Sequence, residues 1–205
     1  MSEKRPYHHG DLRRVIVETA EQMLDESRGW QFTLREVARR ADVSHAAPYR
    51  HFPDKAALLV ELALRGFDQL NRDMVAALAQ ASAEPSSCLP SPRAAFKAVA
   101  LAYITFGEKN PSLYRLMFSS EAGDPRTTHL DERAMAALDV VERLLVQGQQ
   151  AGVFKPQAVR SQATACWAQV HGITMLSIEG LLMPEKVGDA PVAAALEILL
   201  DGLAA

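Results

Sequence analysis

Side chains that can bind phosphate gather between residues 33 and 55. The donors stand near the ends of two expected short helices, and they are Thr33, Tyr49, His51 and Lys55. Small or polar residues begin the second of these helices: Ser44, His45, Ala46 and Ala47. Flanking donors can fix phosphates, while small side chains let a helix enter a groove about 12 Å wide. This pattern favours a nucleic-acid ligand.

Two short helices and a tight turn must position these residues. Thr33 caps the first helix, and Glu36 three residues later completes a capping box. Asp42 lies in the turn, and Ser44 caps the second helix, which we expect to reach about Phe52. Two short helices joined in this way, with arginines outside, are typical of a helix-turn-helix unit.

The run TLREVARRADVSHAAPYRHFPDKAALL resembles the tetracycline-repressor (TetR) family of bacterial transcription regulators, and the match covers about residues 7–67. The resemblance implies phosphate contacts from Thr33, Tyr49, His51 and Lys55. It implies base-edge contacts near Ser44, from His45, Ala46 and Ala47, with Arg50 nearby. The runs WAQVHG and YHHGDLR resemble one TetR subgroup that is marked by a W-x-x-x-H-G signature.

Pro48 departs from the family pattern, which more often has Leu or Ile at this position. Proline is tolerated only in the first turn of a helix, so we expect a stiffer and shorter reading helix. Arg39 and Arg40 are interpreted as a solvated face. Two interpretations stand for Lys4, Arg5, His8 and His9, either an arm along the minor groove or a frayed terminus.

Apolar residues recur at helical spacing along almost the whole chain, which predicts an all-α fold of about nine helices. After the helix-turn-helix unit, helices are expected near residues 55–80, 94–108, 112–119, 130–151, 158–182 and 192–204, with loops at 82–93 and 122–128. We divide the chain into a DNA-binding domain, 1–53, and an effector-binding and dimerisation domain, 54–205, in which 54–80 is a connecting helix.

Two of the later helices have more apolar surface than one monomer can cover. The helix from Ala158 has two apolar stripes, and small residues line the second, at Ala165, Ala168 and Gly172. The last helix, VAAALEILLDGLAA, is apolar nearly all round. A helix that is apolar on two sides is buried on two sides. We therefore expect a homodimer through these last two long helices.

Aromatic and methionine residues in this second domain are candidates for an effector cavity, because helices broken by Pro or Gly leave pockets in bundles. The candidates are Tyr103, Phe106, Tyr114, Met117, Phe118, Leu145, Trp167, His171 and Met175. The simpler interpretation is that most of them form core, with Trp167 and His171 a packed pair. The effector is expected to be small and largely apolar, and Tyr103, Arg115 or His171 could orient its polar group.

Composition excludes several classes of protein. The 205 residues carry a net charge of −3, with 48% hydrophobic and 23% charged residues, which is ordinary globular usage. Two cysteines are too few for a disulfide framework, and no apolar run reaches the ~20 residues that span a bilayer. No catalytic, metal-binding or cofactor-binding constellation is visible, so we expect no cofactor and a cytoplasmic protein.

The resulting hypothesis is a ligand-responsive repressor that a small effector releases from a palindromic double-stranded DNA operator. A transcriptional activator of the same fold stays open. An all-helical enzyme acting on a small apolar substrate, or a helical adaptor that binds only protein, is the alternative from another class.

Overall fold

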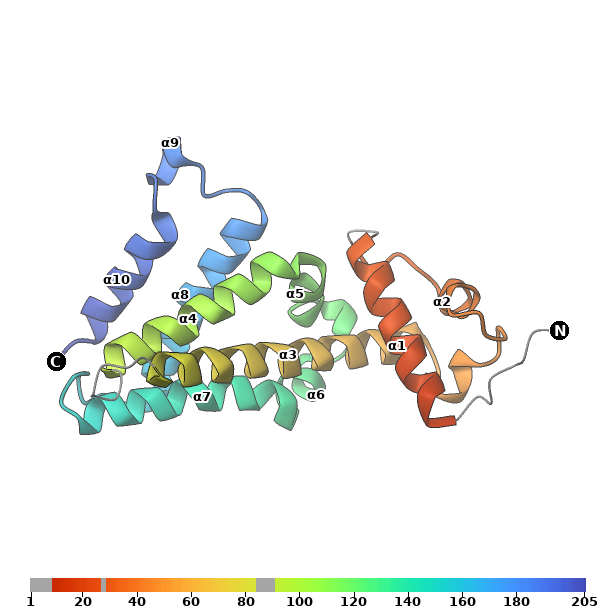
Figure 1. Ribbon diagram of the computed structural model, residues 1–205, viewed down its shortest axis with the longest axis horizontal. Coiled ribbons are helices and arrows are strands. Elements are labelled where there is room, and N and C mark those ends of the chain that lie inside the picture. Colours follow the sequence, from red (N-terminus) through yellow and green to blue (C-terminus); the bar gives the residue numbers. More distant parts are fainter. Residues whose placement is uncertain (1–8, 27–28, 84–90) are drawn as a thin grey trace. The chain divides into compact units, whose positions relative to one another are not determined.

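The computed structural model describes residues 9–26, 29–83 and 91–205. The N-terminal arm suggested by Lys4, Arg5 and His8 lies outside these residues, as does Cys88. The α-helices, labelled in Figure 1, are α1 (His9–Glu26), α2 (Leu34–Arg40), α3 (Lys55–Ala83), α4 (Pro92–Lys109), α5 (Pro111–Met117), α6 (Pro125–His129), α7 (Glu132–Gln150), α8 (Val159–Ile178), α9 (Pro184–Val187) and α10 (Pro191–Leu203). Short 3-10 turns occur at Pro48–Arg50 and Ser120–Ala122.

The all-α prediction is confirmed, and the long helices match the expected ranges closely. Two of the ranges expected after residue 54 were wrong. The predicted loop at 122–128 holds a 3-10 turn and the start of α6, because Asp124 caps that helix by accepting a hydrogen bond from the backbone N–H of Arg126 at 2.9 Å. The predicted helix 158–182 ends at Ile178, ahead of Gly180, whose φ of 66° is left-handed. No helix among the described residues is both long and apolar enough to span a bilayer.

Contact density divides the chain into two compact units. The first runs to Gly66 and also contains residues 110–131, whereas the second contains residues 67–109 and 132–205. The predicted boundary after residue 53 differs from this division. The first part of α3 and all of α5 belong to the first unit, because Met117 of α5 packs so closely on α3 that a Cβ on Gly66 would lie 2.5 Å from its sulfur.

The core of the first unit forms where α1, α2 and the start of α3 turn their apolar faces inward. Its fully buried members are Ile16, Ala20, Leu24, Val37, Ala38, Leu58 and Leu62. Ion pairs between α1 and α3 lie at the edge of this core, and one of them joins Arg13 to Glu61 at 2.8 Å. The helix-turn-helix unit therefore rests on a small apolar core.

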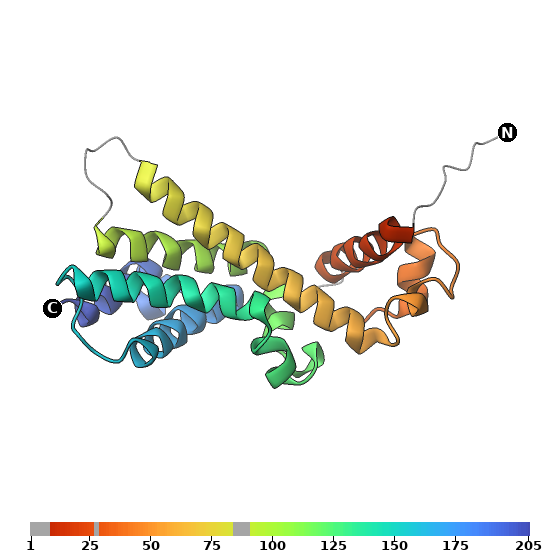
Figure 2. The ribbon, with the colours of Figure 1, turned by 90° about the horizontal axis from the view of Figure 1, so that it is seen from below.

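The second unit is a bundle of α4, α7, α8 and α10 (Figure 2). Its core contains Phe96, Val99, Phe106, Val140, Leu145, Cys166, Val170, Leu196 and Leu200. An ionic cluster ties α10 to α4, since Arg93 donates at 2.7 Å to both Glu197 and Asp201. Hydrogen bonds from Lys97 and Arg93 lower the pKa of Glu197, so this carboxylate stays charged near neutral pH.

Phe154 closes the bundle after α7 ends. Its ring is 1% exposed and packs edge-on against Phe96, with 6.2 Å between the ring centres. A backbone bridge pairs Phe154 with Ala204, and the N–H of Lys155 donates to the carbonyl of Leu203 at 2.8 Å. Gly148 of α7 makes room for the ring, because a Cβ there would lie 2.0 Å from Phe154 Cδ2.

We expect Gly148→Ala to lower the free energy of unfolding by about 1–3 kcal/mol, the usual cost of overpacking a dense core. Urea unfolding followed by circular dichroism measures this change. Gly29→Ala is the control, since its Cβ would meet nothing within 4 Å, and it should leave stability within about 0.5 kcal/mol. Equal stability of the two variants would contradict the close packing of Phe154 on α7.

Candidate functional site

The start of α2 is fixed by the predicted capping box. The backbone N–H and the hydroxyl of Thr33 both donate to Glu36 Oε2, at 2.7 and 2.9 Å, and the N–H of Glu36 donates to the Thr33 hydroxyl oxygen at 3.2 Å. These donations lower the pKa of Glu36, with the backbone bond the larger cause. Thr33 thus presents its donors to a carboxylate of its own chain.

Asp42 forms the turn after α2 with a φ of 53°, and among the described residues it has the single positive φ outside glycine. Aspartate tolerates this left-handed conformation better than most residues do. The turn is closed by backbone bonds, in which the N–H of Asp42 donates to Arg39 and that of Val43 to Ala38, at 3.3 and 3.0 Å. The chain therefore leaves α2 sharply and enters the reading segment, residues 44–52.

The reading segment is not the α-helix that the sequence analysis predicted. It is a turn at residues 45–47 followed by a 3-10 turn at Pro48–Arg50. Pro48 lacks an N–H and is buried, and its carbonyl accepts hydrogen bonds from His51 at 3.0 Å and Phe52 at 2.9 Å. Proline therefore sits at the first position of a helical turn, where the ring is tolerated, and the predicted shortening goes further than expected.

Most of the predicted DNA-binding residues lie at the surface of this segment. Ser44, His45, Ala46 and Arg50 are exposed, and Tyr49 is 49% exposed. His51 and Lys55 are half-buried. Ala47 is only 7% exposed and faces the core. Among the predicted DNA-binding residues, it is the one whose side chain is too buried to enter a DNA groove.

The charges around the segment are partly neutralised within the first unit. Arg40 forms a bidentate ion pair with Glu26, in which each terminal nitrogen of the guanidinium donates to one carboxylate oxygen. This hydrogen bonding is the main reason why the pKa of Glu26 is lowered. The ammonium of Lys55 lies 5.7 Å from the ring centre of Phe32. Arg35, Arg39 and Arg50 are exposed, as are Glu36, Asp42 and Asp54, so charges of both signs are exposed in and around the reading segment.

The candidate effector residues are divided between the two units. Tyr114, Met117 and Phe118 belong to the first unit, and the others belong to the second. Phe106 and Leu145 are at most 1% exposed, as are Tyr114 and Met117, so these four side chains are buried within their units. Met175 is half-buried on α8.

Three of the candidates do meet, between α4 and α8. Trp167 Nε1 donates to Tyr103 Oη at 3.3 Å, and Tyr103 Oη lies 3.4 Å from His171 Nδ1. The rings of Trp167 and His171 are 6.0 Å apart, and Trp167 is 44% exposed. This polar triad, defined by these three residues, combines hydrogen-bonding groups with an accessible aromatic surface.

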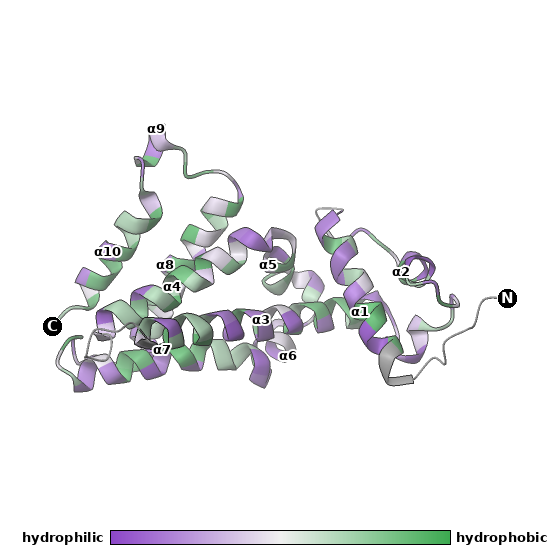
Figure 3. Cartoon of the chain, in the orientation of Figure 1, coloured by the Kyte–Doolittle hydropathy of each residue, from purple (hydrophilic) through white to green (hydrophobic). Residues whose placement is uncertain are grey.

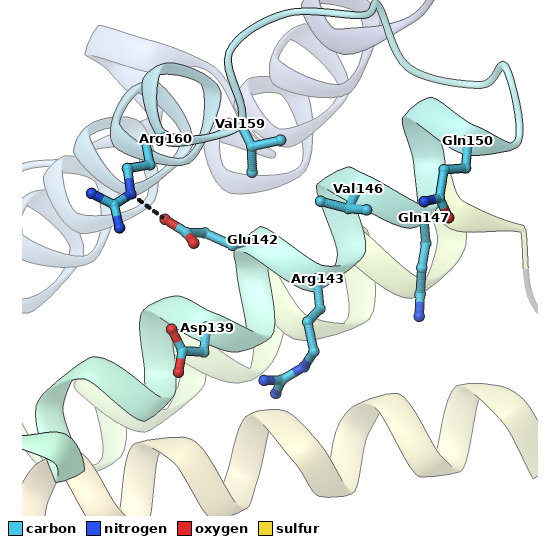
Figure 4. Close-up of a pocket in the computed structure, with 8 residues that line it drawn as sticks. All are labelled: Asp139, Glu142, Arg143, Val146, Gln147, Gln150, Val159 and Arg160. Carbon is cyan, nitrogen blue, oxygen red and sulfur yellow. Dashed lines mark ion pairs between the residues drawn. The ribbon is translucent and has the colours of Figure 1, made fainter.

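One hollow of the second unit was missed by the sequence analysis. A surface groove of about 610 Å³ runs between α7 and the start of α8 (Figure 4) and is lined by Asp139, Glu142, Arg143, Val146, Gln147, Gln150, Val159 and Arg160. Periodicity assigned these residues to the outer faces of helices, and no single-helix pattern shows that two such faces adjoin.

A thiol nucleophile is disfavoured at Cys166, because burial raises its pKa to about 11. Such a thiol stays protonated near neutral pH, and thiols react as thiolates. Cys166 is therefore not a candidate nucleophile.

Comparisons with known proteins identify the family. Residues 16–62 match the family model described as "Bacterial regulatory proteins, tetR family", and residues 96–203 match "Tetracyclin repressor-like, C-terminal domain". The solved structure of a protein of unknown function from Rhodococcus sp. RHA1 is 34% identical, with a TM-score of 0.81 over 98% of this chain and 100% of that one. PfmR, a TetR family transcriptional regulator from Thermus thermophilus, shares the fold at 21% identity, with a TM-score of 0.63 over 93% of this chain and 99% of that one.

Curated relatives are also similar over part of the chain. The nucleoid occlusion factor SlmA of Marinomonas sp. (strain MWYL1) is 29% identical over 137 residues, which are 67% of this chain and 65% of that protein. SlmA of Vibrio cholerae is 28% identical over 145 residues, or 66% of this chain and 70% of that protein. The match thus spans less than two thirds of the Marinomonas relative.

A helix-turn-helix unit joined to a helical bundle defines a DNA-binding transcriptional regulator. The second family model alone spans more than half of the chain, and together the two models cover both of its parts. The chain belongs to the TetR family.

The carboxyl group of Glu36 in the capping box of α2 should have a pKa below that of an ordinary glutamate. Because the folded pKa of Glu36 is lowered, its contribution to stability is complete above the unfolded pKa of about 4.3 and is lost as pH falls through the lower folded value. NMR titration of the Thr33 amide should give a midpoint below about 4.3. Glu36→Gln should abolish this transition, and a midpoint at or above the unfolded value would contradict the box.

Proposed function

We propose that the chain is a ligand-responsive, homodimeric repressor that leaves a near-palindromic operator when a small effector binds. The observation that carries this proposal is the exposed reading segment, whose side chains at Ser44, His45 and Arg50 reach solvent while Pro48 and Phe52 anchor it to the core. A short anchored segment with exposed polar groups suits base-edge contacts in a major groove.

The contacts divide into positioning and reading. Tyr49, His51 and Lys55 bind phosphates and fix the register, whereas His45, Ala46 and Arg50 read base edges beside Ser44. Thr33 contributes less than the sequence pattern implied, because a phosphate must compete with the Glu36 carboxylate for both Thr33 donors. Ala47 supports the segment from below, since its side chain is buried.

A second copy covers the outer faces of α8 and α10. Ala165, Ala168 and Leu176 form an exposed stripe on α8, and Ile198 of α10 is 70% exposed. The apolar colouring of both helices is visible in Figure 3. Large apolar side chains left in water on adjacent helices are typical of a protein interface. Two-fold pairing then presents two reading segments to half-sites about 34 Å apart.

A glycine in the middle of α8 supports the same pairing. A Cβ on Gly172 would meet nothing within 4 Å in the described part of this chain. Glycine inside a helix costs roughly 0.5–1 kcal/mol relative to alanine, and nothing within the described residues requires it at this position. Close approach of a partner helix is a physical reason for Gly172.

The polar triad of Tyr103, Trp167 and His171 anchors the effector, an aromatic or aliphatic compound with one hydrogen-bonding group. A ligand that binds better to a dimer with altered spacing of its reading segments shifts the population away from the operator. The coupling is reciprocal, so the operator weakens the effector by the same factor, typically about 1–3 kcal/mol. The predicted cytoplasmic location stays a prediction.

Substitutions should separate the two kinds of DNA contact. Tyr49→Phe and Lys55→Ala should weaken binding to all sequences alike, by roughly fivefold for about 1 kcal/mol. Lys55→Ala should also reduce the salt dependence by about 0.9 log unit per log unit of salt. His45→Ala should change the sequences selected from a randomised duplex library.

Fluorescence anisotropy with selected and scrambled duplexes measures these effects. Lys109→Ala removes one exposed positive charge from the end of α4 and should leave DNA binding unchanged. If His45→Ala weakened all duplexes equally while Tyr49→Phe changed sequence preference, the division into positioning and reading residues would be wrong.

Tyr103→Phe should weaken the effector about fivefold or more, since it removes one hydroxyl from the triad. A thermal-shift screen of small aromatic and aliphatic carboxylic acids and alcohols supplies the test compounds, and release of labelled operator DNA measures their action. Ser177→Ala removes a hydroxyl from α8 outside the triad and should have no effect. Unchanged effector binding by Tyr103→Phe, with normal DNA binding, would exclude the triad as the anchor.

A further inference from the structure

Residues 179–190, the arm, connect α8 to α10 and stand out from the bundle, with α9 at their apex (Figure 1). Every side chain of the arm is exposed except Leu182, which is half-buried. Three large apolar residues are among those exposed, with Leu181 at 41%, Met183 at 47% and Val187 at 40%. The described part of this chain leaves them in contact with solvent.

The arm nevertheless has a defined backbone. Gly180 and Gly188 adopt positive φ angles of 66° and 84°, which glycine allows without strain. The N–H of Leu181 donates to Leu176 at 2.9 Å, and the N–H of Gly188 donates to Pro184 at 2.8 Å. The exposed apolar side chains therefore lie on a hydrogen-bonded turn, and no surface within the described part of the chain covers them.

The groove between α7 and α8 has matching chemistry. Val146, 37% exposed, and Val159 provide apolar surface, and charged side chains of both signs surround them (Figure 4). Arg160 is 92% exposed and lies 3.9 Å from Glu142, at the limit of an ion pair, so its charge is largely available. Acidic and basic groups alternate on the arm as well, at Glu185, Lys186 and Asp189.

One chain cannot bring the arm and the groove together. The groove includes Val159 and Arg160 at the first turn of α8, whereas the arm begins after its last turn. The 20 residues of α8 separate them by about 30 Å. A two-fold axis across the middle of α8, where Ala168 and Gly172 allow close approach, makes the two copies of α8 antiparallel and sets the arm of one over the start of the other.

We propose that the arm of each subunit docks into the α7–α8 groove of its partner, with Met183 and Val187 against Val146 and Val159. Glu185 and Asp189 then lie near Arg143 and Arg160, and Lys186 lies near Asp139 and Glu142. This inference rests on the proposed homodimer and extends it, because it assigns an occupant to the groove and makes the exchange of arms part of the interface.

Site-directed cross-linking tests the exchange. Cys88→Ser removes one native thiol, and Cys166 stays, since it is 2% exposed. In this full-length background, Val146→Cys and Val187→Cys are combined and treated with a short bis-maleimide. We expect a covalent dimer on a denaturing gel. The matched control pairs Val187→Cys with Val75→Cys, an exposed valine of α3 that lies outside the groove, and it should stay monomeric on the gel.

Light scattering before cross-linking separates this inference from the function on which it rests. A dimer in solution that gives no covalent product at 146 and 187 overturns the exchange and leaves the proposed dimer standing, whereas a monomer in solution overturns both. Equal products from the two pairs indicate random collision and also overturn the exchange.

A substitution gives a second measurement that does not depend on a cross-linker. Val187→Asp places a charge on the apolar side of the arm and should raise the dimer dissociation constant at least tenfold. Val75→Asp introduces the same charge at the exposed valine of α3 and should not change it. Equal dissociation constants for Val187→Asp and the unsubstituted protein would overturn the docking of the arm.

Discussion

The reading segment depends on a single anchoring constraint, the burial of Pro48 and Phe52 against the first unit. The nine residues of the segment share four backbone hydrogen bonds, one of them from the N–H of Phe52 to the carbonyl of Pro48, and an isolated helix of this length would be unstable in water. Here the rings of Pro48 and Phe52 supply the apolar contact, and the Pro48 carbonyl accepts hydrogen bonds from the N–H groups of His51 and Phe52. The polar side chains between these anchors are consequently held in place at the surface.

Hydrogen bonds and an ion pair hold α2, the helix that precedes the reading segment, in place. The capping box of Thr33 and Glu36 fixes the start of α2, and the left-handed Asp42 fixes its exit, so the entry to Ser44 is set from both ends of a seven-residue helix. Arg40 is held by Glu26 of α1, which fastens the same helix from its outer side. The reading segment, which lacks internal helical stability, is thus supported by its neighbours, and such rigid support suits the proposed contacts with base edges.

The sequence was sufficient to predict the helices, because their apolar spacing reflects burial directly. The ranges expected for α3, α4, α7 and α10 agree with the structure within about three residues, and the capping box at Thr33 was visible as a pattern. The prediction of an α-helix after Ser44 was wrong, because it followed the family pattern and gave too little weight to Pro48, which lacks the N–H that a helix interior needs. The polar triad was half visible, since Trp167 and His171 share one helical face, but Tyr103 comes from another helix. The groove beside Val146 needed the packing of α7 on α8, which no local pattern contains.

The outer faces of α8 and α10 differ from the reading segment, because they expose apolar side chains where the reading segment exposes polar ones. The first unit uses its apolar residues to hold a polar segment at the surface, whereas the second leaves Leu176 of α8 and Ile198 of α10 exposed to solvent. Each exposed apolar group costs free energy in a monomer, and the proposed pairing would recover that free energy, so dimerisation and the stability of this unit would be linked by mass action. In the proposed homodimer, pairing sets the spacing of the two reading segments, which makes the α8–α10 surface the element that the proposed effector would perturb.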